Sequence, residues 1–102
     1  MDYSEIVMNI IIHSGNARSY AMEAISFAKK GELDKAKKSL EDSSSEMSLA
    51  HKIQTDLIQK EAGGQKTEVT LLMVHAQDHL MNALTVKDLA SEVVDVYSKL
   101  YK

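Results

Sequence analysis

Apolar and small residues recur at alternating steps of three and four along three long segments of the chain. The segments run from Ile6 to Phe27, from Leu33 to Leu57 and from Val69 to Leu100. This alternation is typical of α-helices that meet along a coiled-coil-like seam. The first seam comprises Ile6, Ile10, His13, Ala17, Tyr20, Ala24 and Phe27. The second comprises Leu33, Ala36, Leu40, Ser43, Met47, Ala50, Gln54 and Leu57. The third comprises Val69, Leu72, Ala76, His79, Ala83, Val86, Ala90, Val93, Tyr97 and Leu100. No strand pattern or internal repeat competes with this alternation, so the sequence predicts an all-α fold.

Glycines mark the helix boundaries, because proline is absent from the chain. Gly31 follows two lysines, as expected where a helix stops, and the Glu61–Lys66 segment EAGGQK indicates a second connection. The predicted helices therefore cover roughly residues 4–30, 32–61 and 67–101. Asp2 with Glu5 favours a capping-box-like start for the first helix. Gly15 lies inside a helical pattern, and we interpret it as a position of close packing.

Short connections force neighbouring helices to be antiparallel, so the chain is predicted to form an up-down-up three-helix bundle. A length of 102 residues is that of one domain, which we place at residues 1–102. The net charge of −3, with Arg18 as the one arginine, argues against a nucleic-acid-binding protein. Cysteine is absent, and neither a signal peptide nor a membrane span is recognisable. We expect a soluble cytoplasmic protein without direct membrane insertion.

The third predicted helix is apolar on more than one side. Asp78 lies roughly 130° from the centre of its seam, where solvent is expected, yet Leu71, Val74 and Met81 flank it. A helix that is apolar nearly all round is buried on more than one side. Two helices of the same chain do not easily cover both stripes. The second stripe is therefore predicted to contact further copies of the chain.

Asp78 has no cation in its own segment, since no lysine or arginine lies between Lys66 and Lys87. In a symmetric oligomer packed about the second stripe, one Asp78 from each chain would converge near the axis. Carboxylates at close range repel each other, and burial adds to that cost. A divalent cation would relieve both effects with hard oxygen ligands, whereas protonation or shared water would relieve them less completely. The alternative is that Asp78 lies at a solvent-exposed edge of the helix and has no special role.

His75 and His79 are four residues apart, so their side chains lie on the same face of the third helix. Zinc proteolysis is disfavoured because Ala76 occupies the position of the general-base glutamate in HExxH. Structural zinc binding, phosphoryl acceptance by a neutral imidazole and ordinary packing all remain open from spacing alone. His79 falls on the seam and His75 at its edge. If one of the two is a phosphoryl acceptor, His75 is therefore the more accessible choice, with His79 as a supporting residue. His13 is interpreted as a packing residue.

Three stretches carry a resemblance to a known family. They are GNARSYAMEAISFAKKG (residues 15–31), AHKIQTDLI (50–58) and above all LLMVHAQDHLM (71–81). Together they resemble the lactose/cellobiose-type IIA component of the bacterial sugar phosphotransferase system, over nearly the whole chain. The resemblance implies a homotrimer packed as a nine-helix bundle. It also implies that His75 takes a phosphoryl group from the phosphocarrier protein HPr and passes it to a cysteine of a IIB protein, for sugar entering through the membrane component IIC.

The resemblance further assigns roles to neighbours of His75. Asp78 matches an aspartate that holds a divalent metal, usually magnesium, at the trimer axis, and Gln77 and His79 match supporting residues of the site. Asn82 stands where the family often has threonine. Two alternatives stay open on the sequence: a regulatory or metal-binding helical trimer without transfer chemistry, and a histidine phosphotransfer domain of two-component signalling. Lactose, cellobiose, chitobiose and β-glucosides are all compatible with the sequence as the transported sugar.

Overall fold

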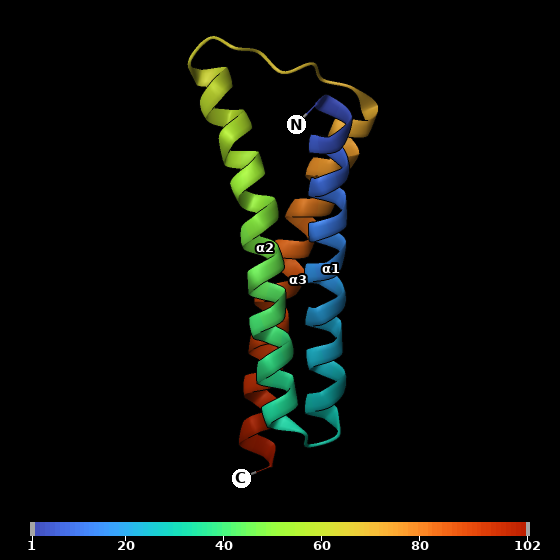
Figure 1. Cartoon of the computed structure of the whole chain (residues 1–102). Helices are drawn as coiled ribbons and strands as arrows, with labels where there is room; N and C mark the ends of the chain where they lie inside the picture. The colour runs from blue at the N-terminus through green and yellow to red at the C-terminus, as the bar shows by residue number, and fades with distance from the viewer. Residues whose placement is uncertain (1, 102) are drawn as a thin grey trace.

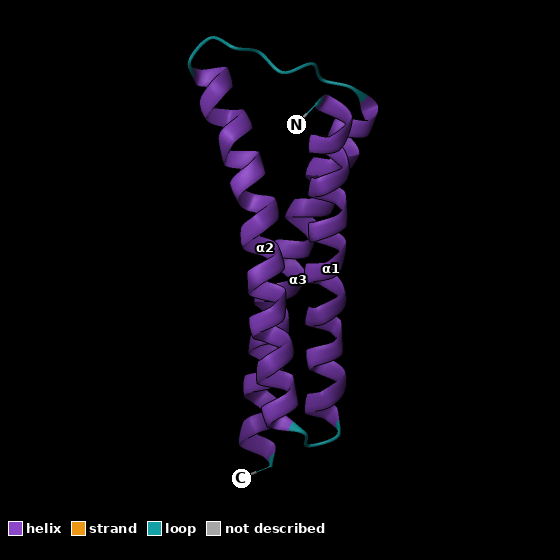
Figure 2. Ribbon diagram, in the orientation of Figure 1, coloured by secondary structure: helices purple, strands orange, loops and turns teal. Residues whose placement is uncertain are grey.

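The computed structural model describes residues 2–101, which form three long helices in a rod of 53 × 20 × 19 Å. Helix α1 spans Tyr3–Lys29, α2 spans Leu33–Ala62 and α3 spans Leu71–Leu100. Figure 1 shows α1 and α3 running in the same direction with α2 running against both. Within the described residues the only other structure is the two connections and the chain ends (Figure 2). The predicted all-α, up-down-up bundle is confirmed.

The predicted start of the first helix is confirmed by its capping contact. The Asp2 side chain accepts a hydrogen bond of 2.8 Å from the backbone N–H of Glu5. This satisfies one of the amide groups that a helix start leaves without an intrahelical acceptor. Next to it, the Tyr3 hydroxyl donates to the carbonyl of Glu68 at 2.8 Å. The start of α1 is therefore tied to the connection that precedes α3.

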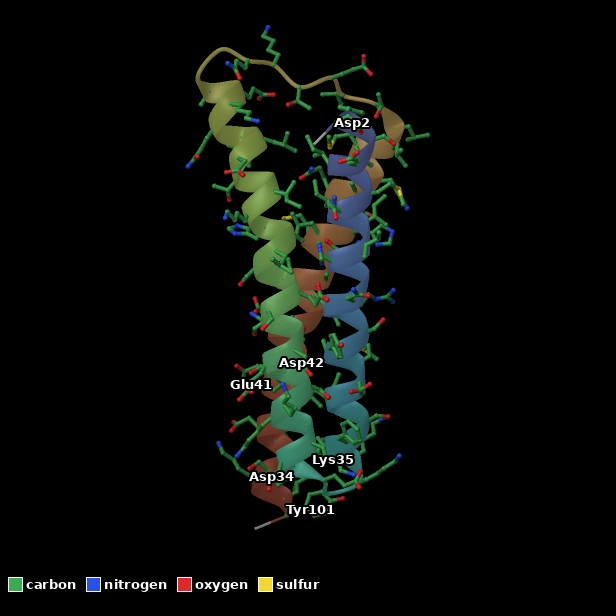
Figure 3. The ribbon with its side chains drawn as sticks, in the orientation of Figure 1. Asp2, Asp34, Lys35, Glu41, Asp42 and Tyr101 are labelled. Carbon is green, nitrogen blue, oxygen red and sulfur yellow. The ribbon has the colours of Figure 1, made fainter. Side chains whose placement is uncertain are left out.

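The opposite end of the bundle is closed by Gly31 and Tyr101. Gly31 has a φ of +78°, a left-handed conformation that glycine adopts without strain. The Tyr101 ring lies against this glycine, and its hydroxyl donates a 2.7 Å hydrogen bond to the carbonyl of Lys29. Figure 3 shows Tyr101 at the far end of the rod from Asp2. The end of α3 is thereby fastened to the α1–α2 turn. The helix stop predicted at Gly31 is confirmed, since α1 ends at Lys29.

The third helix begins at Leu71 and not at residue 67, so the predicted boundary was wrong by about one turn. Thr70 is extended, and its hydroxyl caps the helix by accepting a hydrogen bond of 3.1 Å from the N–H of Met73. Val69, which the apolar pattern assigned to the third seam, is 76% exposed in the connection. A threonine cap thus overrode the apolar periodicity at this end.

The cores of α1 and α3 share about half of their positions with the predicted seams, and the other core positions lie one residue later. The buried positions of α1 are Val7, Ile10, Ser14, Ala17, Ala21, Ala24 and Ala28. The bulkier residues of the predicted seam, Ile6, Tyr20 and Phe27, are only half-buried at the flank of the helix. Small residues allow close approach of two helices, so alanine occupies the innermost positions while longer side chains cover the margins. In α2 the prediction was correct at Ala36, Ser43, Met47 and Ala50.

Gly15 lies inside an unbroken α1, as predicted, but its own chain does not supply the close packing that we expected there. A Cβ atom built at Gly15 would meet no atom within 4 Å among the described residues. Nothing in its own chain therefore requires a glycine at this position.

Candidate functional site

The imidazoles of His75 and His79 lie together on the outside of α3, one helical turn apart. Their Nε2 atoms are 3.1 Å apart, and the ring centroids are separated by 4.5 Å with the planes at 87°. His75 is exposed and His79 is half-buried. This is the order expected from the sequence, in which His79 lies closer to the helix seam than His75.

The contact between the two rings constrains their protonation. One Nε2 carries the proton and donates, so the other must offer its lone pair. The edge-to-face contact also restricts rotation of the more exposed His75 ring. A neutral imidazole that keeps a free lone pair is a nucleophile near neutral pH. His75 therefore combines exposure to a visiting protein with an orientation held from within its own helix.

Gln77 does not belong to the histidine pair within its own chain. Residues two apart on an α-helix point in nearly opposite directions, and Gln77 faces α2. The Gln54 amide N–H donates to Oε1 of Gln77 at 2.7 Å. The Nε2 of Gln77 lies 3.5 Å from the Met73 sulfur. Both glutamines line a cavity of about 180 Å³ between α2, α3 and the connection that joins them.

Asp78 lies on the exposed stripe that the sequence predicted. Leu71 is 86% exposed, Val74 50% and Met81 43%, so this side of α3 has no covering helix in its own chain. Oδ1 of Asp78 accepts a hydrogen bond of 3.1 Å from the Asn82 amide. Across residues 2–101, a single chain brings together no group of three or more histidines and carboxylates that could hold a metal. Any cation at Asp78 would therefore need ligands from further copies.

Two polar residues of α2 were not singled out from the sequence. Gln54 was placed on the α2 seam without a role, and its contact with Gln77 depends on the registration of α2 against α3.

Glu46 of α2 accepts hydrogen bonds from two residues of α1. Its Oε2 lies 2.5 Å from Nδ1 of His13, and its Oε1 lies 3.2 Å from the Asn16 amide nitrogen. The interpretation of His13 as a satisfied packing residue agrees with its half-buried position and its contact with Glu46. No local sequence signal connects residues this far apart in the chain.

An exposed histidine on a helical bundle, in contact with a second histidine one turn away, is an arrangement that can carry a phosphoryl group. Residues 5–98 match the family described as PTS system, Lactose/Cellobiose specific IIA subunit. The chain belongs to this family and is a phosphoryl carrier, hence a phosphotransferase, of the sugar phosphotransferase system. Membership sets aside the two-component histidine phosphotransfer class.

Relatives in sequence and structure cover almost the whole chain. The lichenan-specific phosphotransferase enzyme IIA component of Bacillus subtilis is 59% identical over 99 residues, which are 97% of this chain and 90% of that protein. The crystal structure of the cellobiose-specific enzyme IIA from Bacillus anthracis matches with a TM-score of 0.92 and 50% identity, covering 98% of this chain and 93% of the other. The IIA(Chitobiose) chain in a solution structure with HPr matches at 0.86 and 38% identity, covering 100% and 99%.

None of the three helices, as described over residues 2–101, has the length and apolar character needed to cross a membrane.

Proposed function

We propose that His75 accepts the phosphoryl group from phospho-HPr and delivers it to a cysteine of a cognate IIB protein, with His79 in support. The observation that carries this assignment is the exposed His75 ring, held by His79 through the 3.1 Å contact between their Nε2 atoms. A relative of 38% identity and closely similar fold has been solved as a IIA(Chitobiose)–HPr complex. That similarity supports HPr as the donor to this chain.

The transfer requires little covalent assistance from the carrier. The lone pair of one His75 ring nitrogen forms a bond to phosphorus while the donor P–N bond breaks, and that electron pair returns to the donor imidazole. Such loose transition states depend on positioning and on stabilisation of charge. No lysine or arginine lies between Lys66 and Lys87, so the donor protein has to supply most of the positive charge. The phosphoryl group adds close to two negative charges to a segment of α3 that carries no cation, which favours its onward transfer.

We further propose that three chains associate through the exposed stripe of α3 into a nine-helix bundle. Measured around α3 from Asp78, His75 lies about 60° to one side and Gln77 about 100° to the other. In a cyclic trimer each subunit presents one flank of its helix to the opposite flank of its neighbour. The His75 flank of one chain would then face the Gln77 flank of the next. This arrangement supports a role for Gln77 that its own chain does not provide.

A divalent cation, Mg²⁺ by preference, is proposed at the axis of that trimer. Asp78 fits the requirement, because it offers carboxylate oxygens that are exposed and engaged only by the Asn82 amide among the contacts described for residues 2–101. Hard oxygen donors are the ligands that Mg²⁺ prefers. When bound, the ion would neutralise the converging carboxylates and stabilise the assembly. Its role is structural because Asp78 and His75 diverge on α3.

The cellular setting proposed is the cytoplasm, where HPr, the IIB protein and the inner face of the membrane component IIC would be in reach. The relatives named for lichenan, galactose and cellobiose are 59%, 52% and 50% identical to this chain, and one named for N,N'-diacetylchitobiose is 41% identical. We therefore propose that the transported sugar belongs to the group for which these relatives are named.

Reconstitution tests the assignment of the acceptor. The protein is mixed with HPr, Enzyme I and phosphoenolpyruvate, and acid-labile phosphate is mapped to individual histidines. Phosphate is expected on His75 in the wild type, absent in His75→Gln and still present in His79→Gln. Label retained in His75→Gln but lost in His79→Gln would reverse the roles. An intact trimer that takes up no phosphate would favour a regulatory or metal-binding protein without transfer chemistry.

A further inference from the structure

We propose that Gln54 of α2 is a positioning residue for the phosphoryl transfer, acting through the side-chain amide of Gln77. The inference rests on the proposed function, in which chains pack with the His75 flank of one beside the Gln77 flank of the next. In this arrangement Gln77 presents an N–H group to the neighbouring His75 or to its phosphoryl oxygens. Gln54 determines which end of the Gln77 amide points outward.

The hydrogen bonds around Gln77 define the orientation of its amide. The Nε2 of Gln54 donates to Oε1 of Gln77 at 2.7 Å, and both side chains are half-buried. This bond uses the carbonyl of Gln77 and leaves its NH₂ group on the other side. Reversing the Gln77 amide alone would place two NH₂ groups face to face. Reversing both amides would place the Gln77 carbonyl oxygen against the Met73 sulfur, where it gains no hydrogen bond. Gln54 therefore holds Gln77 with its donor end away from α2.

The donor end of Gln77 lacks a strong acceptor in its own chain. Its contact in the described residues is the Met73 sulfur at 3.5 Å, and a thioether is a weak acceptor. An NH₂ group has two protons to donate, and a partly buried donor without a good acceptor is unfavourable. Gln77 thus retains hydrogen-bonding capacity that an imidazole nitrogen or a phosphoryl oxygen could use.

The space around Gln77 allows such an acceptor to approach. Gln54 and Gln77 share the cavity of about 180 Å³, whose other lining includes Leu57 and the exposed Ile58 and Val74. Figure 1 shows α2 leaning away from α1 and α3 toward this end of the bundle. Val74 belongs to the exposed stripe on which we place the neighbouring copy, so the cavity adjoins the proposed interface. The occupant expected there is a second copy of this chain.

The experiment measures single-turnover transfer from phospho-HPr to His75 in full-length trimers. Gln54→Met keeps the length of the side chain and removes its donor, and we expect the rate constant to fall roughly three- to tenfold. In Gln54→Glu the carboxylate accepts a hydrogen bond where the glutamine amide donates one. The Gln77 amide should then turn its carbonyl outward toward the phosphoryl anion, and the rate constant should fall further. Gln59→Met, at an exposed position of the same helix, is the matched control and should transfer at the wild-type rate.

A double-mutant comparison separates positioning from simple stabilisation. If Gln54 acts through Gln77, Gln54→Met should have no further effect on the rate in a Gln77→Met background, while HPr affinity and trimer mass stay at wild-type values. A wild-type rate in Gln54→Met, an equal loss in the Gln77→Met background, or dissociation of the Gln54→Met trimer would each overturn the inference. Wild-type protein that takes no phosphoryl group on His75 would instead overturn the proposed function.

Discussion

The Nε2 atoms of His75 and His79 lie 3.1 Å apart, which is within hydrogen-bond distance. One ring donates at this contact and the other accepts. The contact restrains the more exposed ring without occupying both of its nitrogens. His79 is therefore expected to act on the rate of transfer and not on the identity of the phosphorylated residue.

Replacing His79 by leucine tests this relationship. The variant should still be phosphorylated on His75, but the transfer rate should fall roughly three- to tenfold, because the acceptor ring loses a hydrogen bond that orients it. His79→Gln retains a polar group on the same turn and should lose less. Rapid-quench measurement with labelled phospho-HPr gives the rates, and phosphate mapping gives the site. Wild-type rates in both variants would remove His79 from the mechanism.

The order of the helices and the exposed stripe of α3 followed from the sequence because both depend on local periodicity. The same periodicity placed some core positions of α1 and α3 correctly, such as Ala17 and Ala83, and placed the others one residue too early. It did so because it weighted the bulky Ile6 and Phe27 above the alanines that permit close approach. It also missed the Thr70 cap at the start of α3. The Gln54–Gln77 contact could not be predicted, because it depends on how two antiparallel helices are registered in space.

Asp78 should make the stability of the assembly sensitive to metal. If three copies share a cation at this residue, a chelator should lower the Tm of the wild type. Asp78→Leu removes both the ligand and the repulsion among the carboxylates, so its Tm should not respond to chelator. Asp95→Leu, an exposed carboxylate on the same helix paired with Lys99, is the control and should respond as the wild type does. Equal responses in the wild type and Asp78→Leu would remove the metal from this account.

Two buried serines should respond oppositely to the same substitution. Ser43 donates a hydrogen bond of 2.7 Å to the carbonyl of Ala17, whereas Ser14 is the one buried side-chain polar group without a partner within residues 2–101. Ser43→Ala should lower the free energy of unfolding by about 1 kcal/mol. Ser14→Ala should raise it by about 1 kcal/mol, since it removes an unpaired hydroxyl and favours the helix. Denaturant unfolding measures both changes, and a loss in both variants would contradict the assignment of Ser14.

Gly31 and Gly15 offer a matched pair of glycine-to-alanine substitutions. Gly31 has a φ of +78°, and an added Cβ would lie 3.1 Å from Cε1 of Tyr101, so Gly31→Ala should destabilise the bundle by about 1–2 kcal/mol. At Gly15 the backbone is helical and a Cβ would meet no described atom within 4 Å, so Gly15→Ala should stabilise an isolated chain by roughly 0.5–1 kcal/mol. Thermal unfolding with trimer mass recorded in parallel distinguishes the two effects. If Gly15→Ala instead weakens the trimer, the close packing that its own chain lacks is supplied by a neighbouring subunit.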